Sequence, residues 1–195
     1  VHADLKMRAL EALKVPEVYE FACQASIQEA EGYGNRETGY AQVEPIKPRI
    51  VETVEFARRM GMTRLGVIFC VGLRREAAIV QDILETNYFE VVSILCKAGR
   101  VSKEELGLDR THQIDMQAKQ ESMCNPLLQA EIANHYEVEL NILLGLCVGH
   151  DSLFIKQADG FCTVLAVKDR LLGHNPLAAI YQYHGYYRRL KTPLP

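Results

Sequence analysis

LGVIFCVG at residues 65–72 and LNILLGLCVG at residues 140–149 decide the fold. Each stretch is a short apolar run that passes directly into cysteine and glycine. Short apolar runs that alternate with helical stretches are typical of βαβ units and a parallel sheet. The expected strands cover residues 65–69, 90–95, 140–146 and 163–167. We therefore predict an α/β fold with an open, mostly parallel, Rossmann-like or flavodoxin-like sheet of about four strands.

Helical patterns fill the segments between these strands. The expected helices cover residues 73–86, 126–136 and 152–157, and a last one runs from residue 176 to about 187. Right-handed crossovers place such helices on both faces of a parallel sheet. The connection from Lys97 to Met123 interrupts this alternation, and connections of that length are usually functional or partly structured.

The first sixty residues predict helices only. Leu5 and Ala9 share a face in one segment, Pro16 begins a second helix, and a third continues past Val54 and stops at Gly61. A glycine-rich link at residues 32–39 separates the second helix from the third. We expect one domain over residues 1–195, with a helical extension at 1–61 and an α/β core at 62–195.

Composition excludes several classes of protein. The formal net charge is −3 and there is no lysine or arginine run, which argues against a nucleic-acid partner. No apolar run approaches the roughly 18–20 residues that cross a bilayer, and nothing at the start resembles a secretory segment, so we expect a cytoplasmic protein without a membrane partner. The chain is not a short, loop-rich secreted one, and most of its six cysteines lie in apolar strand contexts, which favours reduced thiols or metal ligation over a disulfide framework.

Three of the expected strands end in cysteine followed closely by glycine. Cys70 precedes Gly72, Cys147 precedes Gly149, and Cys96 ends the strand between them in the sequence. Ligands of open parallel sheets bind beyond the carboxyl ends of the strands, where glycine lets backbone and ligand approach closely. The sequence therefore predicts a cysteine-lined cleft at this edge.

A fourth thiol and two histidines join this edge through helix starts and loops. Cys124 directly precedes Asn125-Pro126, a capping residue followed by proline, and the positive end of a helix favours a thiolate. His174 stands before a similar Asn-Pro pair, and His150 follows Cys147 closely.

Purely structural roles for these residues compete with the interpretation as a ligand site. Free cysteine is among the most buried residue types, so each thiol could serve only as a small hydrophobic group. His150 and His174 could each satisfy a nearby loop carbonyl, and Asp151 is a candidate helix cap. Cys23, inside a helix, and Cys162, at the beginning of a strand, are assigned structural roles.

Ligand chemistry narrows what such a site could hold. Thiolate-rich sets suit zinc, copper(I) or iron–sulfur clusters, and added histidine favours zinc or a cluster with an open position. Because no C-x-x-C pair occurs, the ligands would come from distant loops. The predicted metal ligands are Cys70, Cys96, Cys124, Cys147, His150 and His174, and Lys168 or Arg170 could neutralise an anionic ligand at the same edge.

Three longer motifs carry a family resemblance: CNPLLQAE from Cys124, GLCVGHD from Gly145 and KDRLLGHNP from Lys168. They resemble the uncharacterised metal-binding protein family known as domain of unknown function 1847, found largely in anaerobic bacteria and archaea. The resemblance covers about residues 41–187 and implies metal binding through the six positions above, without an established reaction. Members of that family carry a further cysteine-rich head, whereas this sequence starts at Val1, which leaves open whether more ligands lie upstream.

Three functions remain in competition. The first is a metal or iron–sulfur protein, either redox-active or using the metal as a Lewis acid on a small molecule of anaerobic metabolism. The second is a metal-independent enzyme with Cys124 or Cys147 as nucleophile and His150 or His174 as base. The third is a small-ligand binding module without catalysis, although neither G-x-G-x-x-G nor G-x-x-x-x-G-K-[ST] occurs. The sequence does not decide whether the chain is an enzyme. It also leaves open the substrate, the metal and whether a homo-oligomer forms.

Overall fold

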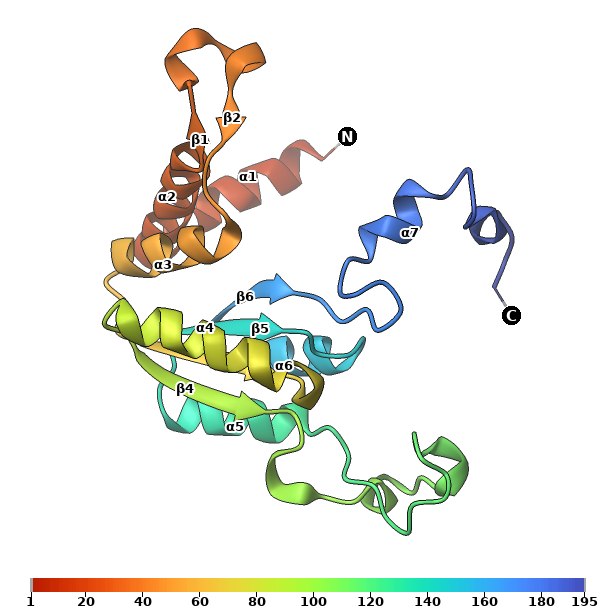
Figure 1. The fold of residues 1–195 in the computed structure, drawn as a ribbon. Coiled ribbons are helices and arrows are strands. Elements are labelled where there is room, and N and C mark those ends of the chain that lie inside the picture. Colours follow the sequence, from red (N-terminus) through yellow and green to blue (C-terminus); the bar gives the residue numbers. More distant parts are fainter. Residues whose placement is uncertain (1, 195) are drawn as a thin grey trace. The chain divides into compact units, whose positions relative to one another are not determined.

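The computed structural model describes residues 2–194, and the chain divides into two compact units, Val1–Thr63 and Arg64–Pro195. The first unit is mainly helical and the second is an α/β unit (Figure 1). Among residues 2–194, no helix is long and apolar enough to cross a membrane.

The first unit contains the three expected helices, which are α1 (Ala3–Ala12), α2 (Pro16–Glu31) and α3 (Arg49–Arg59). Phe21 and Phe56 pair α2 with α3 edge to face at 5.0 Å between ring centroids. Gln28 reinforces this pairing by donating a hydrogen bond of 2.8 Å to Glu55.

The glycine-rich link of this unit is a small hairpin, which the sequence did not indicate. Strand β1 (Tyr33–Gly34) pairs antiparallel with β2 (Glu44–Pro45), and two 3₁₀ turns, Arg36–Thr38 and Tyr40–Gln42, lie between them. Strands of two residues are too short to show the alternating pattern by which a strand is recognised.

The α/β unit is built on four parallel strands, which confirms the predicted α/β fold. They are β3 (Arg64–Phe69), β4 (Glu90–Leu95), β5 (Leu140–Leu144) and β6 (Phe161–Ala166). Their order across the sheet is β4-β3-β5-β6. The first strand, β3, therefore lies inside the sheet. The chain adds β4 on one side of β3 and then β5 and β6 on the other side, so the order of the strands reverses between β3 and β5. This reversal is the topological switch point beside which open α/β sheets bind ligands.

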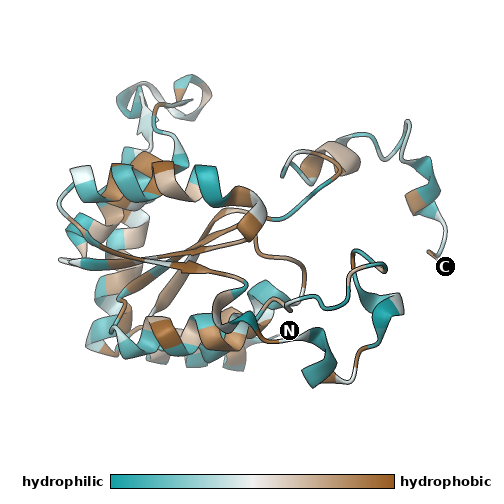
Figure 2. Ribbon diagram, turned by 60° about the horizontal axis from the view of Figure 1, so that its bottom comes forward, coloured by the Kyte–Doolittle hydropathy of each residue, from teal (hydrophilic) through white to brown (hydrophobic). Residues whose placement is uncertain are grey.

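Helices cover both faces of this sheet, as the crossover rule predicts. Helix α4 (Arg74–Thr86) lies on one face, and α5 (Pro126–His135) and α6 (His150–Gln157) lie on the other, with the apolar strands between them (Figure 2). Ile68 and Leu143 of the sheet share a buried cluster with Phe154 of α6. Cys70 and Cys96 belong to the same cluster, so the edge that carries them is anchored in the core.

Some element ends differ from the prediction. Strand β5 stops at Leu144 because Gly145 takes a φ of 67°, which leaves the extended region. Helix α6 begins earlier than expected, at His150, after Gly149 with a φ of 86°. The helix expected at residues 176–187 shortens to α7 (Leu177–Tyr181), and the 3₁₀ turn Arg188–Lys191 follows. No α7 residue is buried, so tertiary packing does not extend this helix.

The long connection after β4 is ordered by its own hydrogen bonds. It contains the 3₁₀ turns Ala98–Arg100, Lys103–Leu106 and Arg110–His112. Ser102 and Ser122 form an antiparallel bridge. Glu121 pairs with Lys103 at 3.0 Å and with Lys97 at 3.7 Å, which ties the outgoing chain to the returning chain.

The buried cluster predicts the effect of truncating Phe154, which is fully buried in α6. Phe154→Ala should lower the free energy of unfolding by about 3–5 kcal/mol because it removes apolar contacts and leaves a cavity. Urea denaturation followed by circular dichroism measures this. Leu153, its neighbour, is 46% exposed, and Leu153→Ala should change the value by no more than about 0.5 kcal/mol. Equal effects of the two substitutions would contradict this core.

Candidate functional site

Backbone hydrogen bonds place Cys70 and Cys96 side by side beyond the carboxyl ends of β3 and β4. The last pair in their parallel register is Phe69 with Leu95. The ladder continues one residue further, because the Cys96 amide donates to the Phe69 carbonyl at 2.9 Å. On the other side of β3, the Cys70 amide donates to the Leu144 carbonyl at 3.2 Å. Both thiols are therefore held at one edge by the sheet itself.

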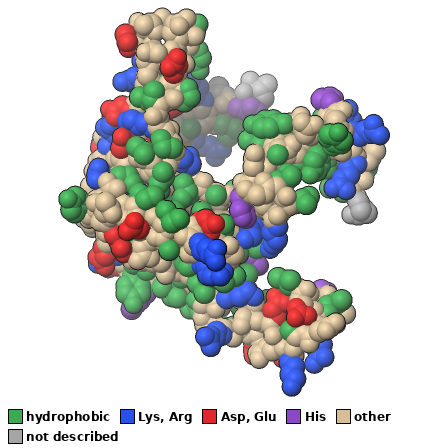
Figure 3. Space-filling model, in the orientation of Figure 1, with side chains coloured by type: hydrophobic (Ala, Val, Ile, Leu, Met, Phe, Trp, Pro, Cys, Tyr) green, Lys and Arg blue, Asp and Glu red, His purple; other side chains and the backbone are tan. Residues whose placement is uncertain are grey.

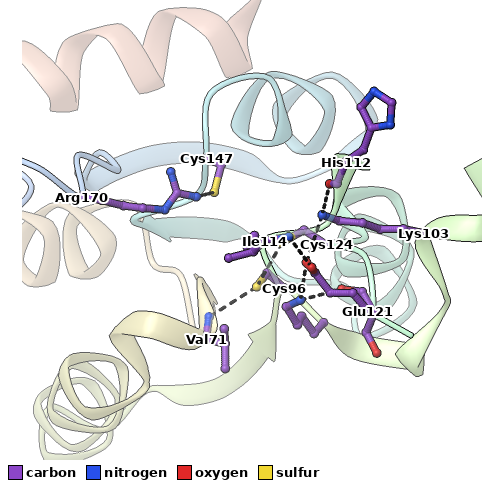
Figure 4. Close-up of polar contacts among 11 residues, drawn as sticks. Val71, Cys96, Lys103, His112, Ile114, Glu121, Cys124, Cys147 and Arg170 are labelled. Atoms are coloured by element: carbon purple, nitrogen blue, oxygen red, sulfur yellow. Dashed lines mark hydrogen bonds and ion pairs between the residues drawn. The ribbon is translucent and has the colours of Figure 1, made fainter. Parts of the chain in front are cut away.

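Cys124 reaches the same edge through the start of α5. The Asn125 side chain caps this helix by accepting from the Leu128 amide at 3.0 Å, as the sequence predicts. The Asn125 amide also donates to the Cys96 carbonyl at 2.7 Å. These bonds bring Cys124 Sγ to 3.7 Å from Cys96 Sγ, while the Val71 amide donates to Cys96 Sγ at 3.3 Å (Figure 4).

Gln129 is a residue of this arrangement that the sequence analysis missed. Its side chain is fully buried one turn into α5 and donates to the Ile94 carbonyl at 2.8 Å. The bond joins α5 to the end of β4, directly before Cys96. The signal that could have identified it is a glutamine flanked by apolar residues, Leu128 and Ala130, near the start of a helix.

The fourth thiol has a different neighbour. Cys147 follows β5 and is partly exposed, and the Arg170 guanidinium donates to its sulfur at 2.9 Å (Figure 4). Two positions earlier, the Lys168 ammonium donates to Cys70 Sγ at 3.1 Å. Lysine and arginine side chains gather on the side of the α/β unit toward which the strands point (Figure 3). The segment after β6 thus brings two cations to the thiols.

The two histidines separate in the structure. His150 lies in the first turn of α6, near enough to Cys124 to influence its ionisation, and its Nδ1 is buried without a hydrogen-bond partner in the described chain. His174 instead closes a loop with Asp169: its amide donates to the Asp169 carbonyl at 2.8 Å, and its Nδ1 accepts from the Asp169 amide at 3.2 Å. The structure therefore brings His150 to the thiols and engages the His174 ring with the loop backbone.

The two glycines of the predicted site do different things. A Cβ at Gly72 would lie 3.3 Å from Lys168 Nζ and 3.9 Å from Cys70 Sγ, so the missing side chain keeps space beside both groups. Gly149 has a positive φ and open space around it, so its role is the turn that begins α6.

Hydrogen bonds set very different pKa values within the thiol group. The contact with Cys96 is the largest cause that lowers the pKa of Cys70 to about 4, helped by the Gly72 amide and Lys168 against the effect of burial. The contact with Cys96 likewise lowers the pKa of Cys124 to about 6, aided by the charges of His150 and Lys97. The pKa of Cys96 itself is strongly raised by these two neighbours and by burial. Cys96 is thus a protonated thiol between two thiolates.

Cys147 and Cys162 behave as neutral thiols, because the pKa of each is raised. Burial raises the pKa of Cys147, although the Arg170 charge opposes this. Burial alone raises the pKa of Cys162 to about 11, and this sulfur contacts the Gly160 carbonyl at the beginning of β6. Cys23 lies in α2 of the helical unit.

As it stands, the cysteine edge is a thiol cluster without a finished metal cage. All six cysteines are free. Within residues 2–194, no group of three or more histidine, cysteine, aspartate or glutamate residues is arranged to hold a metal ion. The group nevertheless combines two thiolates, one shared thiol proton and two cations at a switch point, which suits soft-metal binding or thiolate chemistry on an anionic molecule.

Fold and site together define a class: an open parallel α/β protein with thiols at its switch-point edge. The chain belongs to the family described as "Protein of unknown function (DUF1847)", whose model matches residues 1–165. This match confirms the family resemblance. It does not confirm that the protein binds a metal. The matched range includes Cys70, Cys96, Cys124, Cys147 and His150 and ends before Lys168.

A curated relative supports this membership. An uncharacterised protein of Methanocaldococcus jannaschii is 42% identical over 135 residues, which is 69% of this chain and 67% of the relative. No solved structure matches the chain at a significant level.

The lowered pKa of Cys70 predicts a pH-dependent stability. Because folding lowers this pKa, the thiolate stabilises the folded state fully only above about pH 8.5, the ordinary pKa of a thiol. The stabilisation declines as the pH falls and is lost below about 4. The difference in unfolding free energy between the wild type and Cys70→Ser should therefore grow with pH between these limits, as measured by urea denaturation at several pH values.

Cys162 provides a control of opposite sign. Its pKa is raised to about 11, so its contribution is complete below the ordinary thiol pKa and declines as the pH rises toward about 11. A stability difference for Cys70→Ser that does not change with pH would contradict the ionised Cys70.

Proposed function

We propose that the protein binds a thiophilic metal ion through Cys70, Cys96 and Cys124. The observation that carries this proposal is the separation of 3.7 Å between Cys96 Sγ and Cys124 Sγ. Two sulfurs bound at about 2.3 Å to one tetrahedral zinc ion lie about 3.8 Å apart. The hydrogen-bonding influence of Cys96 on Cys70 brings the third sulfur into the same group.

The ionisation of the group supports metal binding. Metals bind thiolates, and the pKa values of Cys70 and Cys124 are both lowered. Cys96 would release its proton when a metal binds, so affinity should rise with pH. The backbone amide of Val71, which already donates to Cys96 Sγ, would continue to stabilise the negative sulfur.

Candidates for the remaining coordination positions lie nearby. His150 has a buried Nδ1 without a partner in the described chain, and Cys147 follows the adjacent strand. Binding would require side-chain rotation, because the described residues form no finished cage. His174 is the weakest of the predicted ligands, since its Nδ1 accepts from the Asp169 amide.

Mixed cysteine and histidine ligands favour zinc, and the short sulfur–sulfur separation fits two thiolates on one tetrahedral metal ion. A bound zinc ion with an open position would supply Lewis-acid activation of a small molecule. In this proposal Cys70, Cys96 and Cys124 hold the ion. The contact with Cys96 is the largest cause of the lowered pKa of Cys70, and Lys168 adds to it. Free thiols of this kind suit a reducing compartment, and we include a cytoplasmic location in the proposal.

Metal binding is tested on the reduced, metal-free chain under anaerobic conditions. Titration with Co²⁺ should produce thiolate-to-cobalt charge-transfer absorption at one equivalent of metal per chain, and Zn²⁺ should displace it. Cys96→Ser and Cys124→Ser should each weaken binding by tenfold or more, since each removes a ligand. Cys162→Ser and Cys23→Ser, which change thiols outside the group, should leave binding unchanged.

Metal and sulfide analysis of anaerobically purified protein completes this test. Zinc without sulfide supports the single ion, while equimolar iron and sulfide would identify a cluster instead. Absence of thiolate-to-cobalt absorption in a folded, fully reduced protein would overturn the metal proposal.

A second candidate function rests on Cys124 and His150. The lowered pKa of Cys124 and the nearby imidazole fit a metal-independent thiol enzyme, whereas Cys147 has a raised pKa and fits a nucleophile poorly. In that case iodoacetamide at neutral pH should alkylate Cys124 several-fold faster than Cys147 or Cys162, as read by peptide mass spectrometry. His150→Gln should slow Cys124, with His135→Gln as a control on another helix. Equal rates at all three thiols would exclude this candidate.

A further inference from the structure

We propose that Lys168 and Arg170 form a subsite for a carboxylate, so that the small molecule handled at the thiol edge is an anion. This inference rests on the proposed function, because it names the substrate class of the same site. Three features around the segment that follows β6 support this subsite.

The first feature is the placement of the two cations. Lys168 contacts Cys70, which follows β3, and Arg170 contacts Cys147, which follows β5. The two side chains therefore border the β3/β5 switch point from a third strand end. Ligands of open parallel sheets lie at this position.

The second feature is the absence of acidic partners. Elsewhere in the α/β unit, partly buried cations have carboxylates: Lys103 pairs with Glu121, and Arg64 pairs with Glu90. Lys168 is likewise partly buried, whereas Arg170 is exposed. In the described part of the chain, the side-chain partners of Lys168 and Arg170 are sulfur atoms. Asp169, which stands between them in sequence, uses its carboxylate to accept the Leu171 and Leu172 amides.

An unmatched guanidinium has a definite chemical preference. Its planar fork of N–H donors fits the two oxygens of a carboxylate, and such charge-assisted pairs are stronger than neutral hydrogen bonds. A thiol sulfur is a weak acceptor by comparison. A ligand carboxylate would therefore be a better partner for Arg170 than Cys147 is.

The third feature is space. Gly72 is exposed, and a Cβ there would come within 3.3 Å of Lys168 Nζ. Any larger residue would crowd the ammonium on this side. The missing side chain thus leaves Lys168 accessible from the edge at which the thiols lie.

Two alkylating reagents of equal chemistry and different charge test this inference. Iodoacetate carries a carboxylate and iodoacetamide does not. In both reactions the thiolate sulfur forms a bond to the methylene carbon, the carbon–iodine bond breaks, and iodide leaves. The ratio of the two rate constants at one thiol cancels that thiol's own ionisation and accessibility, so it reports attraction of the carboxylate.

The experiment uses the reduced, metal-free chain of residues 1–195, with rates read for each thiol by peptide mass spectrometry. The iodoacetate-to-iodoacetamide ratio at Cys147 should exceed that at Cys23 by about tenfold, which corresponds to ~1.4 kcal/mol. Arg170→Gln should return the ratio to the Cys23 value, and Arg170→Lys should retain part of it. Arg188→Gln, a change of an exposed arginine elsewhere, should leave it unchanged.

An equilibrium measurement covers the same point without alkylation. At constant ionic strength, succinate should raise the unfolding temperature of the wild type and leave that of the Lys168→Gln/Arg170→Gln variant unchanged. Equal alkylation ratios at Cys147 and Cys23, or an equal succinate effect in both proteins, would overturn the subsite. The Co²⁺ titration is independent of these readouts. If the protein binds cobalt but shows no preference for iodoacetate at Cys147, the subsite alone is refuted. If it prefers iodoacetate at Cys147 but does not bind cobalt, the metal proposal alone is refuted.

Discussion

The parallel pairing of β3 with both of its neighbours is the constraint on which the rest of the structure depends. Hydrophobic burial on both faces fixes this strand, and parallel pairing makes neighbouring strands end at one edge. The hydrogen-bond ladder extends past the strand ends to the amides of Cys70 and Cys96. The position of these thiols is therefore a property of the backbone, whereas their ionisation is a property of the side chains around them. A substitution can alter the chemistry of the edge without dismantling the sheet.

Buried amide side chains show how tightly the layers of the α/β unit are fitted together. Asn141 is fully buried in β5, and the absent side chains of Gly66 and Gly160 make room for it. A Cβ at Gly66 would lie 2.9 Å from Asn141 Oδ1, and a Cβ at Gly160 would lie 3.2 Å from Asn141 Nδ2. Gln129 plays the corresponding part between α5 and β4. Each uses its amide nitrogen to bind a backbone carbonyl, while its oxygen has no partner in the described chain. Such polar groups favour one packing arrangement over alternatives, at some cost in stability.

Hydrophobic pattern and helix-start signals were enough to predict the fold of the α/β unit. The four strands could be located because each is a short apolar run. The start of α5 could be located because Asn125-Pro126 is a local capping signal. The convergence of Cys70, Cys96 and Cys124 followed from topology, since carboxyl ends of parallel strands share an edge. The hairpin within the glycine-rich link was not predicted, because two-residue strands are too short to show an alternating pattern. The early end of α7 was not predicted, because the length of an unburied helix depends on tertiary contacts that the sequence does not display.

The partners of each group at the edge were harder to predict than its position. Nothing local in the sequence assigns Lys168 to Cys70 across 98 positions, or His174 to the backbone of Asp169. The partner of Gln129 could not be assigned for the same reason, since Gln129 lies in α5 and its acceptor carbonyl, that of Ile94, belongs to β4. Charge and hydrogen-bond partners between distant segments depend on the packed geometry, and the same contacts set the thiol pKa values.

The connection between Cys96 and Cys124 leaves the sheet and returns to the same place. Its two ends are joined by the Asn125–Cys96 backbone bond, and further along by the Ser102–Ser122 bridge. It is therefore a closed appendage whose length and content can vary without moving any strand. In evolutionary terms, such a segment can be exchanged as a module: relatives could keep the same thiols and acquire different recognition through this loop alone.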